Sequence, residues 1–160
     1  MSKPALTLEP NFRSGLERKV AEQLDAAGVE YTHESKWVPY VVPERTAKYL
    51  PDMVIEGTNI LIECKGRFGG SGPGLRFSGD SAKERQKLLL IKEQHPEIDL
   101  RIVFQRASTP IYPKSPTTQA KWCDDHGIPW ADKGTVPKEW LEEIRAQQRC
   151  ASSKKSRKTK

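Results

Sequence analysis

The sequence predicts an α/β fold, with a mixed β-sheet flanked by helices. Segments with the apolar spacing of helices alternate with short apolar segments that are typical of strands. At 160 residues, the chain suits one domain with a single hydrophobic core. Its cysteines lie far apart and its histidines lack ligand spacing, which argues against a disulfide framework and a structural zinc site.

The first helix is predicted to begin at Ser14. Ser14 and Glu17 have the spacing of a capping box, in which the side chain of each residue accepts a hydrogen bond from the backbone amide of the other. An apolar stripe continues from Leu16 until Gly28, where the helix is expected to end. Glu17 therefore has an ordinary structural explanation. We expect residues 1–11 to form a disordered arm before this helix.

Residues 29–42 are predicted to form a strand or extended structure. Aromatic and β-branched residues are frequent in this segment, and Pro39 indicates an edge or irregular strand. Residues 43–48 are polar and break the apolar pattern. We therefore expect them to connect two strands.

A β-hairpin is predicted near the middle of the chain. Residues 49–55 and 60–65 are short apolar segments, and the turn-forming residues 56–59 separate them. Such a hairpin brings Asp52 near Glu63, which follows it by eleven positions.

Side chains alternate along the second strand of this hairpin. Glu63 and Lys65 share one face, whereas Ile60, Ile62 and Cys64 lie on the other. The charged groups at the end of an otherwise buried strand have two explanations. Either the hairpin reaches solvent there, with Glu63 and Lys65 as a weak pair, or its carboxylates hold a hard cation such as Mg²⁺.

A glycine-rich loop is predicted over residues 66–81, which contain six glycines. It matches neither glycine motif that binds nucleotide phosphates, so no nucleotide cofactor is expected. Arg67-Phe68 and Arg76-Phe77 combine guanidinium groups with aromatic rings, which suits phosphates and exposed bases. A disordered, solvated insertion is nevertheless the favoured interpretation of this loop.

The rest of the chain is predicted to contain three helices and one strand. The helices cover residues 83–95, 117–126 and 137–148, and the strand covers residues 100–105. In the first of these helices, the four consecutive apolar residues 88–91 are expected to be buried. Tryptophan and cysteine residues in the last two helices are expected in the core.

The C-terminal residues 149–160 form a basic tail that is predicted to be disordered, because it is almost free of apolar residues. The tail either contacts phosphates or only adds solubility. The whole chain has a formal charge of +6 and a pI near 9.3, which favours a polyanionic partner. No segment has the composition of a membrane span or signal peptide, so a cytoplasmic location without membrane contact is expected.

The order of these elements narrows the fold further. The predicted order is that of the restriction-endonuclease-like nuclease core: a helix, a strand, a hairpin that carries Asp and Glu-x-Lys, a helix and a strand. From about Phe12 to Trp140, the chain resembles the bacteriophage endonuclease I family of Holliday-junction resolvases. Seven segments carry the resemblance: Phe12-Arg13-Ser14-Gly15-Leu16-Glu17, Val38-Pro39-Tyr40-Val41, Pro51-Asp52, Glu63-Cys64-Lys65-Gly66, Glu93-Gln94-His95-Pro96-Glu97, Arg101-Ile102-Val103-Phe104 and Ala131-Asp132-Lys133.

The resemblance implies a metal-dependent, structure-selective endodeoxyribonuclease that resolves four-way junctions and other branched DNA. It places Glu17, Asp52, Glu63 and Lys65 in the active site, with two Mg²⁺ or Mn²⁺ ions per site. The backbone carbonyl of Cys64 would bind metal together with the three carboxylates. Lys65 would orient or deprotonate the attacking water, or stabilise the transition state, and the sequence does not separate these roles.

The resemblance also implies a homodimer with exchanged segments, in which Glu17 comes from one subunit and the other catalytic residues from its partner. The nuclease domain would cover residues 12–148, with residues 43–48 as a possible bridge between subunits. The glycine-rich loop is longer than in the family. The side chains expected to contact DNA are basic: Arg13, Arg67, Arg76, Lys154, Lys155, Arg157 and Lys158.

Two other functions stay open at the level of sequence. One is a nuclease of another target class, such as a restriction-type enzyme, which uses the same chemistry. The other is a non-catalytic nucleic-acid-binding protein whose carboxylates are structural. If the chain is encoded by a phage, the cytoplasm in question is that of the host cell.

Overall fold

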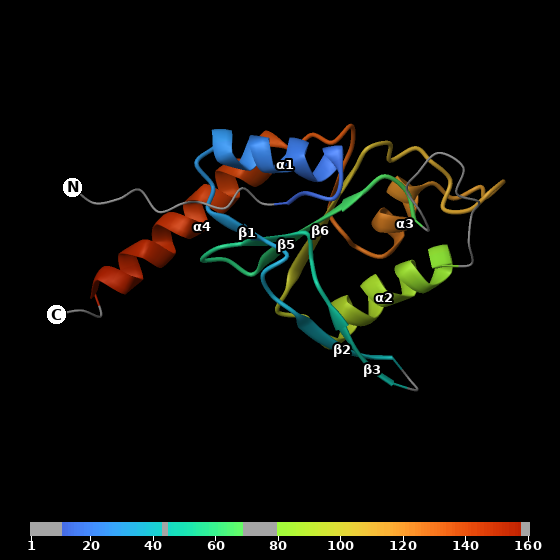
Figure 1. The fold of residues 1–160 in the computed structure, drawn as a ribbon, viewed down its shortest axis with the longest axis horizontal. Helices are drawn as coiled ribbons and strands as arrows, with labels where there is room; N and C mark the ends of the chain where they lie inside the picture. The colour runs from blue at the N-terminus through green and yellow to red at the C-terminus, as the bar shows by residue number, and fades with distance from the viewer. Residues whose placement is uncertain (1–10, 43–44, 69–79, 158–160) are drawn as a thin grey trace.

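In the computed structural model, residues 11–42, 45–68 and 80–157 are described, and they form a mixed α/β fold (Figure 1). The main sheet has five strands in the order β1-β4-β5-β6-β7. Strands β1, β4 and β5 are antiparallel neighbours, whereas β5, β6 and β7 run parallel. The predicted mixed sheet flanked by helices is therefore confirmed. The elements in chain order are α1 (Gly15–Ala26), β1 (Tyr31–His33), β2 (Val38–Val42), β3 (Arg45–Tyr49), β4 (Met53–Ile55), β5 (Ile60–Lys65), α2 (Asp80–Gln94), β6 (Asp99–Phe104), α3 (Gln119–Asp125), β7 (Trp130–Ala131) and α4 (Lys138–Arg157).

Helices cover both faces of the main sheet, because its strands place apolar side chains alternately on two sides. Helices α1 and α4 pack on one face, where Ile60 and Ile62 of β5 are fully buried. Helices α2 and α3 pack on the other face, against Leu61 of the same strand. The predicted alternation is confirmed, since Cys64 packs on the first face and Glu63 contacts the second.

The chain leaves the main sheet after β1 and forms a separate two-stranded sheet at one end of the molecule (Figure 1). Strands β2 and β3 pair antiparallel, from Val38 opposite Tyr49 to Val42 opposite Arg45. Val38 and Tyr49 are both buried in the core cluster that α2 covers. These two side chains anchor the base of the β2–β3 hairpin.

Two predictions about this region are wrong in detail. Residues 29–42 contain two strands that belong to different sheets, rather than one extended segment. Residues 45–48, which were expected to interrupt the strands, belong to β3, because the buried Tyr49 holds this segment beside β2. The strand expected to carry Asp52 is consequently shorter, and β4 begins at Met53.

Helix α2 begins at Asp80, earlier than predicted. Within it, Leu88 and Ile91 are fully buried, whereas Leu89 and Leu90 are only half-buried. Four consecutive residues span more than one face of a helix, so they cannot all point into the core.

Phe68 lies in the core rather than in a surface loop. It is fully buried, and its ring contacts those of Phe104 and Trp122 edge-on, with centroids 5.8 and 5.0 Å apart. Both interpretations of this loop, a solvated insertion and a ring offered to an exposed base, are therefore wrong for Phe68. Arg76 and Phe77 of the predicted loop lie outside the described residues.

Helix α4 continues beyond its predicted end, so the expectation of a disordered tail is wrong up to Arg157. Gln148, at the predicted end, donates its side-chain amide to the carbonyls of Glu30 and Glu56, both 2.9 Å away. These contacts hold the middle of α4 against the sheet. The polar residues that follow extend an existing helix, which costs less than starting a new one.

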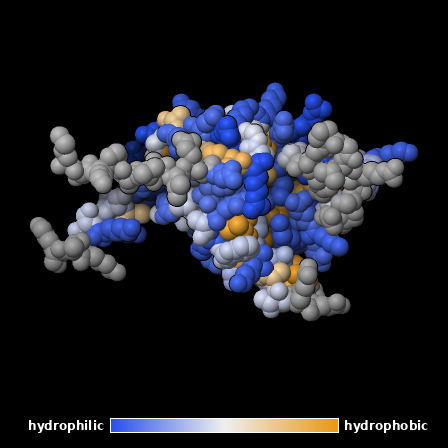
Figure 2. All heavy atoms as spheres, in the orientation of Figure 1, coloured by the Kyte–Doolittle hydropathy of each residue, from blue (hydrophilic) through white to orange (hydrophobic). Residues whose placement is uncertain are grey.

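The face in Figure 2 is largely hydrophilic, with hydrophobic residues in small areas. Among the described residues, the exposed large hydrophobic side chains are those of Trp37, Val41 and Tyr112. None of the helices in the described ranges is long and apolar enough to cross a membrane.

Candidate active site

Asp52 and the end of β5 meet just before the first residue of β4. Strand β4 pairs with β5 as far as Met53, opposite Ile62. Beyond this point the amide of Cys64 donates to the Asp52 carboxylate, 2.7 Å away. The amide and carbonyl of a strand residue point to the same side, so the Cys64 carbonyl also faces this edge. The hairpin thus brings together Asp52 and Cys64, two of the groups predicted to bind metal.

Glu63 and Lys65 form an ion pair on the face that α2 covers. Lys65 Nζ lies 2.9 Å from Glu63 Oε1, and both side chains are shielded from solvent. The fully buried Tyr49 donates its hydroxyl to the other oxygen of Glu63. Glu84 of α2 also contacts the ammonium of Lys65. The orientation of the Glu63 carboxylate is therefore fixed at both oxygens.

Sequence reasoning missed Tyr49 and Glu84 as members of this site. Glu84 carried a signal, because it precedes Leu88 by four positions and Ile91 by seven, which places it on the buried face of α2. Tyr49 carried a weaker one, since a buried tyrosine needs an acceptor for its hydroxyl. Its burial, however, results from the packing of the β2–β3 hairpin, which the sequence did not predict.

The charged groups of this site perturb one another. Burial, followed by the negative charge of Glu63, raises the pKa of Asp52 to about 7, although the Cys64 amide and Lys65 oppose the shift. Burial would lower the pKa of Lys65, but the carboxylates of Glu63 and Glu84 raise it above its ordinary value. The ammonium form of Lys65 is therefore favoured, and Asp52 lies in an excess of negative charge that a bound cation would offset.

The substitution Asp52→Asn is expected to stabilise the metal-free protein at pH 8, by roughly 5 °C in Tm, and to have little effect near pH 4. The pKa of Asp52 is higher in the folded chain, so ionisation opposes folding. This cost is absent below the unfolded pKa of about 4 and complete above the folded pKa of about 7. Thermal melts of both proteins across this pH range measure it.

Asp132→Asn is the matched control for this experiment. Hydrogen bonds from the Ala107 and Lys133 amides lower the pKa of Asp132, so its ionised form favours folding. Its substitution is expected to destabilise the protein as the pH rises, which is the opposite sign. An equal gain in Tm from Asp52→Asn at pH 4 and pH 8 would contradict the assigned environment of Asp52.

Glu17 has the structural role predicted for it and also lies beside the site. Ser14 Oγ accepts from the Glu17 amide at 3.1 Å and donates to Glu17 Oε1 at 2.9 Å, which confirms the capping interaction. The amide of Arg13 donates to Glu17 Oε2 at 3.2 Å. Glu17 is buried, and its charge contributes to the raised pKa of Asp52. Glu17, Asp52 and Glu63 of one chain therefore share one negative region.

His33, at the end of β1, contacts Glu17 as well. Its Nε2 lies 3.0 Å from Glu17 Oε2. Strand β1 pairs with β4 so that His33 lies opposite Met53, which follows Asp52 in the sequence. The ligand atoms of Glu17, His33 and Glu34 all lie within 4.8 Å of one another. Sequence reasoning missed His33 because it considered histidines only for zinc spacing, whereas this contact depends on pairing between distant strands.

The predicted DNA contacts near the N-terminus and the glycine-rich loop occupy different environments. Arg13 is exposed and pairs with Glu34, at a distance of 2.9 Å, close to Glu17. Arg67 is half-buried after the end of β5. Arg76 lies outside the described residues.

The predicted DNA contacts near the C-terminus lie on the last turns of α4. Lys154 and Lys155 are exposed there. Figure 1 shows these turns running away from the main sheet, so they do not border the carboxylates of the candidate site. Arg157 is the last residue of α4, and Lys158 lies outside the described residues.

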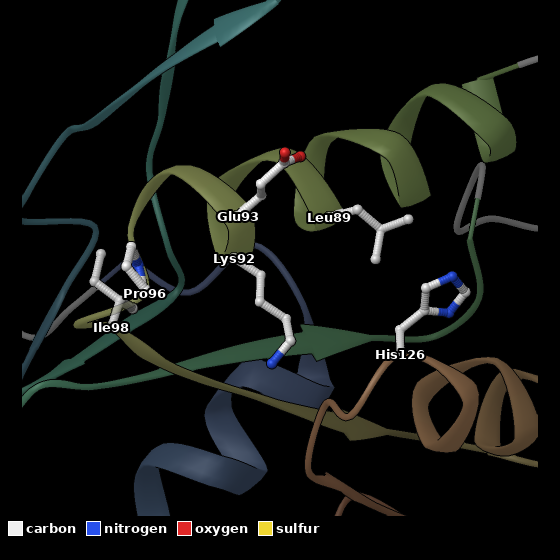
Figure 3. A pocket seen from close by; sticks show the side chains of 6 residues that line it. All are labelled: Leu89, Lys92, Glu93, Pro96, Ile98 and His126. Atoms are coloured by element: carbon white, nitrogen blue, oxygen red, sulfur yellow. The ribbon is translucent and has the colours of Figure 1, made fainter.

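A hollow of about 430 Å³ lies between α2 and the end of α3. Lys92 donates to the Gly127 carbonyl, 3.1 Å away, and the Lys92 and Glu93 side chains leave α2 in different directions (Figure 3). Its lining includes no group of converging carboxylates, so we do not place the active site there. Six residues line it: Leu89, Lys92, Glu93, Pro96, Ile98 and His126.

The chain also matches known proteins over most of its length. The family model of phage endonuclease I matches residues 3–160. The chain is similar to Endonuclease I of Escherichia phage T7, with 42% identity over 132 residues that cover 82% of this chain and 79% of that protein. It is also similar to Endodeoxyribonuclease 1 of Enterobacteria phage T3, with 42% identity over 122 residues that cover 76% and 72%. Because the family model matches nearly the whole chain and these relatives are 42% identical to it over most of its length, the chain belongs to the phage endonuclease I family.

Proposed function

We propose that this chain is a metal-dependent endodeoxyribonuclease that is selective for branched DNA and resolves four-way junctions. The observation that carries the proposal is the group formed by Asp52, Glu63 and the Cys64 backbone where β4 begins, with Lys65 beside it. The name of the phage T3 relative supports DNA as the substrate. A phage enzyme of this kind would act in the cytoplasm of the host cell.

Divalent cations suit the donor groups of this site. The carboxylates of Asp52, Glu63 and Glu17 and the carbonyl of Cys64 are hard oxygen ligands, which Mg²⁺ and Mn²⁺ prefer. The raised pKa of Asp52 reflects burial among negative charges that Lys65 offsets only in part. Asp52, Glu63, Glu17 and the Cys64 carbonyl would together hold the cations.

The residues around these carboxylates would set the geometry of hydrolysis. Two bound cations would supply activation of water and stabilisation of the charge on the phosphate and the leaving oxygen. Tyr49 and Lys65 hold Glu63 in one orientation, and the Cys64 amide holds Asp52. Because its neighbours favour the ammonium form, we assign Lys65 to stabilisation of the transition-state charge rather than to proton removal.

We assign the active form to a dimer in which two chains exchange segments at the β2–β3 hairpin. This hairpin lies outside the main sheet, and its strands pair evenly about the two residues between Val42 and Arg45. If these residues were extended, the same antiparallel ladder would form between two chains related by a twofold axis. Glu17 precedes the hairpin and would then meet the partner's Asp52. Two sites at a fixed separation suit two cuts across a four-way junction.

The basic residues of α4 are expected to contribute to binding of any DNA. The double variant Lys154→Ala/Lys155→Ala should reduce the slope of log affinity against log salt by about 2, because each lysine neutralises about one phosphate. Substitution is preferable to deletion here, since residues 151–157 belong to α4. Binding titrations at several salt concentrations measure the slope.

Lys121→Ala/Lys138→Ala is the control for this experiment. Lys121 lies in α3 and Lys138 at the start of α4, and each is exposed and pairs with an acidic residue four positions later. It removes the same charge from other parts of the surface. Equal slopes for the wild type and the α4 variant would assign the basic residues of α4 to solubility alone. The preference for a junction over a duplex is expected to survive in both variants.

The proposed function is tested with labelled DNA of three shapes: a four-way junction, a linear duplex and a single strand. Each is incubated with the full chain, once with Mg²⁺ and once with a chelator. We expect cleavage of the four-way junction but not of the duplex or the single strand, and only when Mg²⁺ is present. Equal cleavage of the duplex would indicate a nuclease of another target class, and binding without cleavage would indicate a non-catalytic DNA-binding protein.

A further inference from the structure

We propose that His33 is a positioning residue that orients Glu17 for metal binding. The inference rests on the proposed function of the site and extends it to a residue outside the predicted catalytic set. His33 Nε2 donates a hydrogen bond to Glu17 Oε2 across 3.0 Å, and the His33 side chain is only 7% exposed. A histidine that donates to a metal-binding carboxylate fixes the direction of that ligand.

The hydrogen bonds of Glu17 come from two different sources. Arg13 and Ser14 stand at the start of α1, four and three positions from Glu17, so their bonds to Glu17 are local to the cap of that helix. The bond from His33 comes from β1, whose partner strand β4 begins directly after Asp52. His33 therefore connects the cap of α1 to the edge of the sheet where the other carboxylates lie.

These bonds leave one oxygen of Glu17 available for a cation. Oε2 accepts from both the Arg13 amide and His33, which uses its two lone-pair directions. Oε1 accepts only from Ser14 Oγ among the described residues and keeps one lone pair. Oε1 is therefore the oxygen with acceptor capacity left for a cation, and binding through a single oxygen is the expected mode.

His33 is itself held in place. Its backbone pairs with Met53, and its ring packs edge-on against Phe12, with centroids 4.7 Å apart. His33 and Glu17 also lie on the same side of the β2–β3 link in the chain. Their contact is therefore preserved whether or not two chains exchange segments.

Three variants of the full chain test the proposal. His33→Phe keeps a ring beside Phe12 but removes the donor, and His33→Gln keeps a donor. His126→Phe is the control, because His126 is a half-buried histidine that packs on Trp122 in the other core cluster. The affinity for Mn²⁺ is measured by electron paramagnetic resonance without DNA. The Mg²⁺ concentration for half-maximal junction cleavage is measured in single-turnover assays, and junction binding is measured in chelator.

His33→Phe is expected to weaken Mn²⁺ binding and to raise the Mg²⁺ requirement by about 10-fold or more, with junction binding unchanged. His33→Gln should stay within about 3-fold of the wild type, and His126→Phe should match it. Wild-type Mn²⁺ affinity in His33→Phe would overturn the proposal. Equal losses in His33→Phe and His33→Gln would overturn the donor role, since a hydrogen bond alone would then not suffice.

The same measurements separate this inference from the proposed function. If the wild-type protein cleaves no DNA, the proposed nuclease function is wrong, but the Mn²⁺ affinities still decide the role of His33. Thermal melts establish that each variant is folded. If His33→Phe does not fold, His33→Asn replaces it, because its shorter amide does not reach Glu17 from β1.

Discussion

Asp52→Ala, Glu63→Ala and Lys65→Ala are each expected to slow cleavage of a four-way junction on the order of 1,000-fold or more. On the proposed assignment, each substitution removes a charge next to the reacting phosphate: the first two remove the proposed metal ligands, and the third removes the cation assigned to the transition state. Junction binding should persist, because binding energy comes largely from basic contacts to phosphates. Single-turnover cleavage and gel-shift assays on the same junction measure both quantities.

Asp52→Ala is further expected to tighten junction binding, since it deletes an anion from a buried, negatively charged site. Glu93→Ala is the matched control, because it removes an exposed carboxylate from α2 outside the candidate site. Wild-type rates are expected for this control. Full cleavage by the Asp52 variant would contradict the assignment of the site, whatever the other two variants do.

The parts of the fold that could be predicted depend on residues close together in the chain. Ser14 and Glu17 are three positions apart, and their capping interaction is local. The turn between β4 and β5 is also local, and Gly57 there adopts a φ of 71°, which costs glycine little. The alternation of β5 follows from strand geometry alone, so the faces of Cys64 and Glu63 could be predicted as well.

The parts that were missed depend on packing between distant segments. Polar residues 45–48 gave no strand pattern, and β3 forms because Tyr49 is buried at its end. Phe68 follows a charged residue and precedes glycines, yet it fills the space between β6 and α3. The last turns of α4 have almost no apolar residues. They follow Gln148, whose side chain bonds to the backbone just before β1 and just after β4 and so holds the helix in place before them. No local pattern reports such contacts.

The same distinction applies to the candidate site. Asp52, Glu63 and Lys65 could be found from sequence because one hairpin carries all three. His33 reaches the site from β1, whose partner strand β4 is not its nearest neighbour in the chain. Tyr49 reaches it because the β2–β3 hairpin packs into the core cluster that α2 covers. The resemblance to the family supplied Glu17 as a site residue, for which the capping box alone was a sufficient explanation.

The strongest test of segment exchange is a mixed dimer of Glu17→Ala and Asp52→Ala subunits, obtained by co-expression with two different tags. Glu17 and Asp52 lie on opposite sides of the β2–β3 hairpin in the chain. If segments are exchanged there, one composite site collects both substitutions, and the other combines wild-type Glu17 with the partner's Asp52. The mixed dimer is therefore expected to nick a junction at about half the wild-type rate, whereas both mutant homodimers lose on the order of 1,000-fold.

Without exchange, each site of the mixed dimer carries one substitution, because Glu17 and Asp52 then act within one chain, as their proximity in a single chain allows. The mixed dimer would then be as inactive as either homodimer. The comparison requires that both homodimers still bind the junction and that subunits do not reassort, which mass spectrometry of the tagged dimers monitors. A mixed dimer that binds but does not nick would place Glu17 and Asp52 of the same chain in one site. Strands β2 and β3 would then pair within each chain, without exchange.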